Sequence, residues 1–203
     1  MDFKIIDERI NEKGMKYLDY LNKFINELSE INPDSLDEKA RKKFETNKLN
    51  LQRSTRIMKT YKVSEDLKEE IQKINEPQTW MVITENWCGD SAQNLPYIAL
   101  MAEENRNISF RIILRDSNLD IMDHYLTNGT RSIPLLVAFD YNGNELFKWG
   151  ARPNVVQELF LQWKAEGIVK PELYEKLHLW YARNKGQAIE ADFLEILKTV
   201  EQD

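Results

Sequence analysis

Short apolar runs alternate with helical patterns between residues 79 and 166, and this alternation constrains the fold more than any other feature. Residues 79–84, 108–114 and 134–139 are rich in Val, Ile, Leu and aromatic side chains, which is typical of buried strands. Helical patterns over 89–104 and 118–126 separate the three strands. Strands connected through helices usually run parallel. The section therefore predicts a parallel pair built through a helical crossover.

A turn at Asn142-Gly143 then leads into a fourth strand at 145–149. Asn-Gly is the strongest short-range hairpin signal, so the last two strands are expected to be antiparallel. The short helix over 118–126 is expected to end at Asn128-Gly129, a good C-cap pair. Together these elements predict one mixed α/β sheet that helices cover on both faces.

Both flanks of this section read as helical. Apolar residues recur in the first flank at spacings of 3, 4 and 3 with aromatic residues beside them. This broad apolar stripe favours a helix packed on the sheet over one that forms a dimer. The aliphatic members are Leu18, Leu21, Ile25 and Leu28, and the aromatic members are Tyr17, Tyr20 and Phe24. A second helix over 36–61 has sparse apolar positions, so one face should be wet. Ser64 is a good N-cap for a third helix.

Three more helices are expected at 154–166, 171–184 and 187–200, with large apolar side chains as their core; these are Trp163, Leu177, Trp180, Tyr181, Phe193, Leu194 and Leu197. We divide the chain into an N-terminal helical extension (1–76), an α/β core (77–166) and C-terminal helices packed on that core (167–203).

Composition excludes several classes of protein. The 203 residues are 42% hydrophobic, enough to bury a core, and the net charge of −6 argues against a nucleic-acid-binding face. One cysteine permits neither an intramolecular disulfide nor a multi-cysteine zinc site, and the two histidines read as ordinary helix residues. We expect no metal and no cofactor. No signal peptide or membrane-spanning run is visible, so a cytoplasmic protein is expected.

The chemistry centres on Cys88, where the first strand hands over to a helix. Unpaired N–H groups and the helix dipole stabilise a thiolate at such a position. They can lower the pKa of a cysteine to roughly 3.5–7.5, and the thiolate is the reactive species. The placement predicts a reactive thiol; the alternative is an inert, buried cysteine.

The surrounding residues resemble a thioredoxin-fold active site, Trp-Cys-Gly-Pro-Cys, which here reads Trp87-Cys88-Gly89-Asp90-Ser91. Pro96 stands eight residues after Cys88, as the helix proline of that family does. Ile133-Pro134 matches the family's cis-proline that opens the next central strand and faces the cysteine. Gly143 matches the family's following hairpin turn, and Gly150 matches its glycine after the last strand. The resemblance covers about residues 77–166, and the Trp-Cys-Gly-Asp-Ser wording is similar to a bacterial branch with one active-site cysteine.

The resemblance implies a thioredoxin-like fold and assigns roles. Cys88, Ser91 and Pro134 would be catalytic, with Ser91 capping the helix or bonding to the sulfur. A surface of Trp87, Gly89, Asp90 and Ile133 would meet the substrate. Ser91 stands where the family has its resolving cysteine, so an outside thiol would have to release a mixed disulfide.

The carboxylates near the thiol allow two interpretations. Asp90 and Glu85 could tune the thiol or carry protons, but solvated carboxylates are the favoured interpretation. Asp90 would in either case oppose a thiolate beside it. Arg131 and Arg152 could meet an anionic substrate, although loop arginines usually only solvate the surface.

Three functional hypotheses follow. The first is a monothiol thiol–disulfide oxidoreductase that acts on protein or low-molecular-weight thiols and disulfides. The second is a non-catalytic thioredoxin-like module that binds extended peptide beside Pro134. The third is iron–sulfur assembly with glutathione, as in monothiol glutaredoxins, whose Cys-Gly-Phe-Ser has phenylalanine where this chain has Asp90. We expect neither nucleic acid nor membrane as a partner, and the sequence leaves the oligomeric state open.

Overall fold

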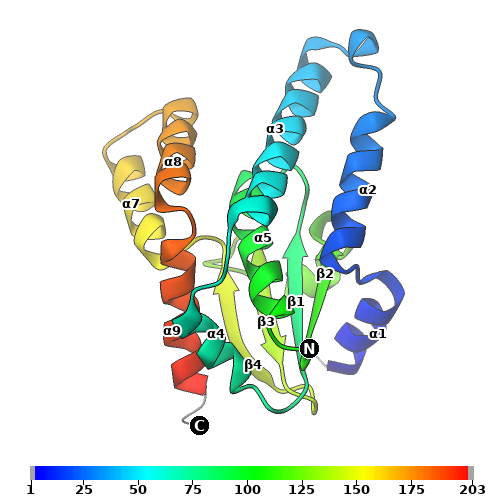
Figure 1. Cartoon of the computed structure of the whole chain (residues 1–203). Coiled ribbons are helices and arrows are strands. Elements are labelled where there is room, and N and C mark those ends of the chain that lie inside the picture. Colours follow the sequence, from blue (N-terminus) through cyan, green and yellow to red (C-terminus); the bar gives the residue numbers. More distant parts are fainter. Residues whose placement is uncertain (1–2, 201–203) are drawn as a thin grey trace.

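The computed structural model describes residues 3–200 (Figure 1). The strands are β1 (Gln78–Thr84), β2 (Ile108–Leu114), β3 (Leu135–Phe139) and β4 (Glu145–Gly150). The α-helices are α1 (Phe3–Lys13), α2 (Tyr17–Ser29), α3 (Glu38–Thr60), α4 (Glu65–Gln72), α5 (Gly89–Glu103), α6 (Leu119–Met122), α7 (Asn154–Ala165), α8 (Lys170–Asn184) and α9 (Gln187–Val200), and two 3-10 turns, Pro33–Ser35 and Arg115–Ser117, complete the order.

The strands form one mixed sheet in the order β2-β1-β3-β4. β1 pairs with β2 in parallel, with Trp80 opposite Phe110, because α5 carries the chain back between them. β1 and β3 are antiparallel, as are β3 and β4. The predicted mixed sheet, its parallel crossover and its closing hairpin are confirmed.

Alternation along the strands gives the sheet two apolar faces. Trp80 and Val82 of β1 point to one face, which α2, α4, α5 and α9 cover. Met81 and Ile83 point to the other face, which residues of α1 and α6 cover. Helices therefore cover both faces, as expected (Figure 1). The carboxyl end of β1 leads into the loop that carries Cys88.

The N-terminal helices differ in part from the prediction. α2 buries its aromatic side chains, Tyr17, Tyr20 and Phe24, whereas Leu18 is 57% and Ile25 is 40% exposed. The predicted helix therefore packs on the sheet, but only the aromatic side of its broad apolar stripe is buried, because these bulkier residues bury more apolar area. α1, which the sequence analysis did not predict, packs Ile6 and Ile10 against the sheet.

The inner face of α3 is polar rather than apolar. Asn47, Asn50 and Ser54 are buried beside Ile57, so this helix buries hydrogen-bonding side chains where apolar periodicity was sparse. Asp37 caps α3 through the amide N–H of Ala40, and Ser64 caps α4 as predicted through the amide N–H of Leu67.

The segment after β2 also departs from the prediction. α6 is one short turn rather than a helix over 118–126. Asn128 and Gly129, both with positive φ, form a tight turn that Thr127 and Thr130 close through reciprocal backbone hydrogen bonds. The expected helix C-cap at this pair is therefore wrong, because both residues satisfy a turn instead.

The three C-terminal helices form as predicted, but they supply two separate cores. Phe193 and Leu197 of α9 join the main core against the sheet. Leu177 and Tyr181 of α8 pack with Val156 of α7 in a small cluster of their own. The α7–α8 hairpin thus stands beside the sheet as a partly independent unit (Figure 1). Within residues 3–200, no helix combines the length and apolar character needed to cross a membrane.

Candidate functional site

Cys88 is the N-cap residue of α5, as the sequence predicts. Its Sγ accepts a hydrogen bond from the amide N–H of Ser91 at 3.4 Å. The thiol in turn donates to the carbonyl oxygen of Ile133 at 3.3 Å. The Ile133–Pro134 peptide is cis, as the resemblance implies. The sulfur and its acceptor are 45 residues apart in the sequence. The fold thus brings two segments together at one end of the sheet, Cys88 to Ser91 and Ile133 to Pro134.

The environment of the sulfur differs from the expected one. Cys88 is 8% exposed, and it belongs to the apolar cluster that α1 and α6 help to form. Burial raises the pKa of the Cys88 thiol, and the neighbouring Asp90 carboxylate raises it further, although hydrogen bonds from Ser91 act in the opposite direction. The expected depressed pKa is therefore wrong, since desolvation outweighs the hydrogen bonds that the first turn of α5 gives to the sulfur.

Ser91 bonds both to the sulfur, which lowers the pKa of the Cys88 thiol, and to the end of β1. Its hydroxyl, in a residue 2% exposed, accepts a hydrogen bond from the Thr84 hydroxyl at 2.7 Å. Ser91 thus connects the end of β1 to the first turn of α5 through its hydroxyl, while its backbone N–H donates to the sulfur. The cap of the helix is Cys88 itself rather than Ser91.

Asp90 is a buried ion-pair partner and not a solvated carboxylate, so the favoured interpretation from sequence is wrong. Its two oxygens meet Nε and Nη2 of Arg152 at 2.9 and 2.8 Å. The Tyr181 hydroxyl donates to the same carboxylate at 2.8 Å. Burial raises the pKa of Asp90, and Arg152 counters that effect. Arg152 likewise does not merely solvate the surface, because its side chain is 13% exposed.

Helix α8 lies directly over Gly89. A Cβ built on Gly89 would stand 2.9 Å from Cε1 of His178, so a larger residue at this position would displace the ring. Burial, with the charges of Arg53 and Arg152, lowers the pKa of His178 to about 4. His178 and Tyr181 are site residues that the sequence analysis missed. The available signal was their shared helix face with Tyr174, at spacings of three and four.

The residues before Cys88 occupy two environments. Glu85 is 8% exposed and accepts the amide N–H of Asp116 at 2.8 Å, so it also is not a solvated carboxylate. Burial raises its pKa. Trp87 is half-buried, and the Arg115 guanidinium lies 4.7 Å from its ring centroid. Trp87 therefore offers a partly exposed aromatic platform at the rim of the site.

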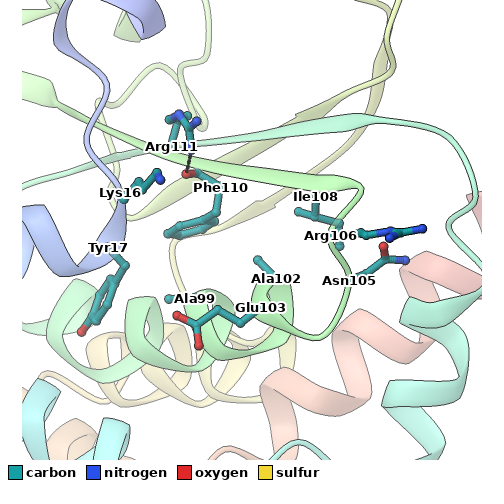
Figure 2. Close-up of a pocket in the computed structure, with 10 residues that line it drawn as sticks. All are labelled: Lys16, Tyr17, Ala99, Ala102, Glu103, Asn105, Arg106, Ile108, Phe110 and Arg111. Atoms are coloured by element: carbon teal, nitrogen blue, oxygen red, sulfur yellow. Dashed lines mark hydrogen bonds between the residues drawn. The ribbon is translucent and has the colours of Figure 1, made fainter.

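Other cavities lie away from the thiol. A pocket of about 250 Å³ sits at the opposite end of α5, between Glu103, Arg106 and the Phe110 edge of β2 (Figure 2). The Tyr17 hydroxyl points away from the other residues drawn there. Among residues 3–200, no group of three or more histidine, cysteine, aspartate or glutamate side chains could hold a metal ion.

Comparison with known proteins places this geometry in a family. The thioredoxin family model matches residues 38–166, more than half of the chain. A protein of unknown function from Pseudomonas aeruginosa aligns with a TM-score of 0.57 and 20% identity over 74% of this chain and 85% of its own. An HIV epitope scaffold aligns with a TM-score of 0.56 and 21% identity over 74% of this chain and 86% of its own. No curated protein matches.

The two solved structures show the fold alone, while the family model covers α3 through α7, including the loop of Cys88 and the segment of Pro134. The mixed four-stranded sheet with flanking helices, the cysteine at the start of α5 and the proline that opens β3 agree with that assignment. The chain has a thioredoxin-like α/β fold with added helices, and it belongs to the thioredoxin family.

Proposed function

We propose that this protein is a monothiol thiol–disulfide exchange protein that acts through Cys88. The observation that carries the proposal is the sulfur at the N-cap of α5, 3.3 Å from the Ile133 carbonyl that precedes Pro134. A sulfur in that position adjoins a backbone segment against which an extended client chain could lie.

The exchange balances with an outside thiol. The Cys88 thiol loses its proton, and its sulfur attacks one sulfur of a client disulfide. A mixed disulfide forms, the client's S–S bond breaks, and the second client sulfur leaves as a thiolate that takes up a proton. The chain has one cysteine. One low-molecular-weight thiol must therefore attack the Cys88 sulfur of the mixed disulfide, which releases the reduced client and leaves a mixed disulfide on Cys88. A second such thiol attacks the low-molecular-weight sulfur of that bond, restores the Cys88 thiol and leaves as a low-molecular-weight disulfide, so that the two thiols supply the two electrons.

The surroundings of the sulfur favour slow exchange at neutral pH. The thiol donates to the Ile133 carbonyl, an interaction that favours the protonated form. Burial and the Asp90 carboxylate raise its pKa in the same direction. We therefore expect the rate of exchange to keep rising with pH above about 8.5, the pKa of a free cysteine, and to show no plateau at lower pH.

A second candidate function is a non-catalytic peptide-binding module. The 8% exposure of Cys88 and the raised pKa of its thiol specifically favour it. In that case the sulfur is a small apolar side chain that fills the core. The α/β scaffold would then bind its client without covalent chemistry.

The single cysteine makes the test clean, because every adduct reports Cys88. The folded protein is incubated with glutathione disulfide over a series of pH values, and intact mass is measured. We expect one glutathionyl group per chain, released by reduced glutathione, with Cys88→Ser as the control that forms none. A native protein that forms no adduct, while the urea-unfolded chain reacts fully, would favour the binding module.

A further inference from the structure

A pocket of about 650 Å³ lies between the C-terminal end of α3, the middle of α5 and the junction of α8 with α9. Its walls include Arg56 of α3, Tyr61 just after that helix, Tyr97 of α5 and Lys185 of the junction. The volume falls within the range of about 300–1,000 Å³ that is typical of small-molecule sites. Cys88 does not line this pocket, so the pocket is a second place where the fold could hold a ligand.

The walls of the pocket carry more positive than negative charge. Arg56, Lys62 and Lys185 line it and are exposed, and none of the three forms an ion pair with the part of the chain that the structure describes. They gather on one surface of a chain whose net charge is −6. A concave surface lined by one sign of charge raises the local concentration of ions of the opposite sign. The charge of these walls therefore indicates an anionic ligand.

The carboxylate on these walls is already bound. Glu190 of α9 is the one acidic residue among the described residues that line the pocket. It accepts hydrogen bonds from the Tyr61 hydroxyl and from the amide N–H of Ser64, the N-cap of α4. Glu190 thus connects α9 to the start of α4 rather than to the cations. Helix α9 also begins on this wall, at Gln187, and the positive end of its dipole favours an anion there.

The hydroxyl of Tyr97 is a second, independent observation. Tyr97 is 7% exposed, and its hydroxyl makes no hydrogen bond to any described residue. The buried polar atoms that are both sealed and unpartnered belong to Tyr17 and Asn47, so the Tyr97 hydroxyl is open to the pocket that it lines. Burial raises the pKa of Tyr97, Arg56 lowers it and Glu190 raises it, because the hydroxyl lies near both charges. An almost buried residue thus presents an unused donor to the pocket.

The fold fixes this hydroxyl beside the cations. The Tyr97 ring packs against Gly186, whose φ is 92°, and a Cβ at that position would collide with the ring. Gly186 follows Lys185 directly, so the ring lies at the α8–α9 junction. The Tyr61 ring meets the Tyr97 ring edge-on, with 4.6 Å between their centroids. The two tyrosine rings therefore provide an apolar surface next to the charged groups.

This lining suits a phosphate ester of a small organic molecule. A guanidinium such as that of Arg56 can donate two parallel hydrogen bonds to a phosphate, and lysine ammonium groups bind phosphate as point charges. A phosphate monoester carries about 1.5 to 2 negative charges at pH 7, which matches three cations better than a single carboxylate does. The tyrosine rings offer contact area to the organic part of the molecule.

We propose that the pocket between α3, α5 and the α8–α9 junction binds a phosphate ester of a small organic molecule. Arg56, Lys62 and Lys185 meet the phosphate group, and the Tyr97 hydroxyl donates to one of its oxygens. The site is separate from Cys88, and the proposal does not depend on the proposed exchange.

Binding is measured on the whole chain with three probes. The protein, labelled with nitrogen-15, is titrated with phenyl phosphate, with inorganic phosphate and with benzoate. We expect saturable shifts of the backbone amides of Gly186 and Gln187. Phenyl phosphate should bind at least about tenfold more tightly than either other probe, because it alone combines the dianionic group with an apolar ring.

Two variants test the residues that carry the proposal. Tyr97→Phe removes a hydroxyl that bonds to no described residue, so the fold should persist while the affinity for phenyl phosphate falls about tenfold, the loss of one hydrogen bond to a charged group. Arg56→Gln should weaken binding by at least the same factor. Arg41→Gln is the matched control, because Arg41 is exposed on the same helix and does not line the pocket. Thermal melting checks that each variant folds.

Four results would overturn the proposal. They are the absence of saturable shifts at Gly186 and Gln187, equal affinities for phenyl phosphate and benzoate, unchanged affinity in folded Tyr97→Phe, and an equal loss in Arg41→Gln and Arg56→Gln. The last result would show attraction to basic surface in general rather than a site. None of the probes contains sulfur, so each of these results leaves the proposed exchange at Cys88 intact.

Discussion

Replacing Arg152 with glutamine should strongly destabilise the protein. The guanidinium makes a two-point contact with Asp90, at 2.9 and 2.8 Å, in a pair whose side chains are 13% and 7% exposed. Breaking a buried pair by removing one partner leaves an uncompensated charge, which costs about 3–5 kcal/mol. At ~2–4 °C per kcal/mol for a chain of this size, the melting temperature should fall by roughly 6–20 °C.

A double-mutant cycle separates the charge from the packing, since Arg152 also lies 4.0 Å from the Phe160 ring centroid. Melting temperature and urea unfolding are measured for Arg152→Gln, for Asp90→Asn and for the double variant. The double variant should lose less than the sum of the single variants, because no unpaired charge is then buried. A drop below about 2 °C for Arg152→Gln, or strict additivity, would refute the reasoning.

The pKa of Asp90 determines in which direction the stability of the fold changes with pH. Burial raises the pKa of Asp90 in the folded chain, so the folded state binds the proton more tightly than the unfolded state, whose pKa is about 3.9. Stability that Asp90 contributes when protonated is lost as pH rises through its folded pKa. Without Arg152 more stability is lost as pH rises. The difference in unfolding free energy between the unmodified protein and Arg152→Gln should therefore shrink toward pH 4. The exposed pair of Arg131 and Asp123 is the control, and Arg131→Gln should change little at any pH.

Three further outcomes are expected. His178 should titrate near pH 4 by proton NMR. The free energy of unfolding should fall by ~3 kcal/mol as pH drops from about 6.5 toward 4, and His178→Gln should remove this pH dependence. Gly89→Ala should push the His178 ring aside, which moves that midpoint toward 6.5 and costs less than the roughly 1–3 kcal/mol of an overpacked core; an unchanged midpoint would contradict the contact. Asn50→Ala should cost about 1–3 kcal/mol in urea unfolding, because the Asn86 carbonyl loses its donor, while Asn22→Ala on the exposed face of α2 should cost far less.

Local pattern was sufficient where the structure depends on near neighbours in the chain. The apolar runs at 79–84 and 108–114 became β1 and β2 almost to the residue, and Ser64 caps α4. Asn142-Gly143 forms the predicted hairpin turn. These features depend on side-chain alternation and on local backbone preferences, which a sequence displays directly.

Local pattern was insufficient where it allowed more than one arrangement. In α2 the predicted broad stripe holds both aliphatic residues, such as Leu18, and aromatic residues, such as Phe24. Only packing against the sheet shows that the aromatic side is the buried one. Asn128-Gly129 fits a helix end and a tight turn equally well. Because α6 ends at Met122, the pair forms the turn between Thr127 and Thr130.

The sequence by itself determined that a cysteine begins a helix after a central strand and that a proline opens the strand that faces it. Only the tertiary structure decided what that cysteine meets. Asp90 finds Arg152 at 62 residues' separation and Tyr181 at 91. Burial of the sulfur is the largest cause of the raised pKa of the thiol, ahead of the charge of the neighbouring Asp90, and that burial is not encoded by residues adjacent to Cys88. Desolvation and Coulomb interactions depend on distance in space, which the order of residues along the chain does not specify.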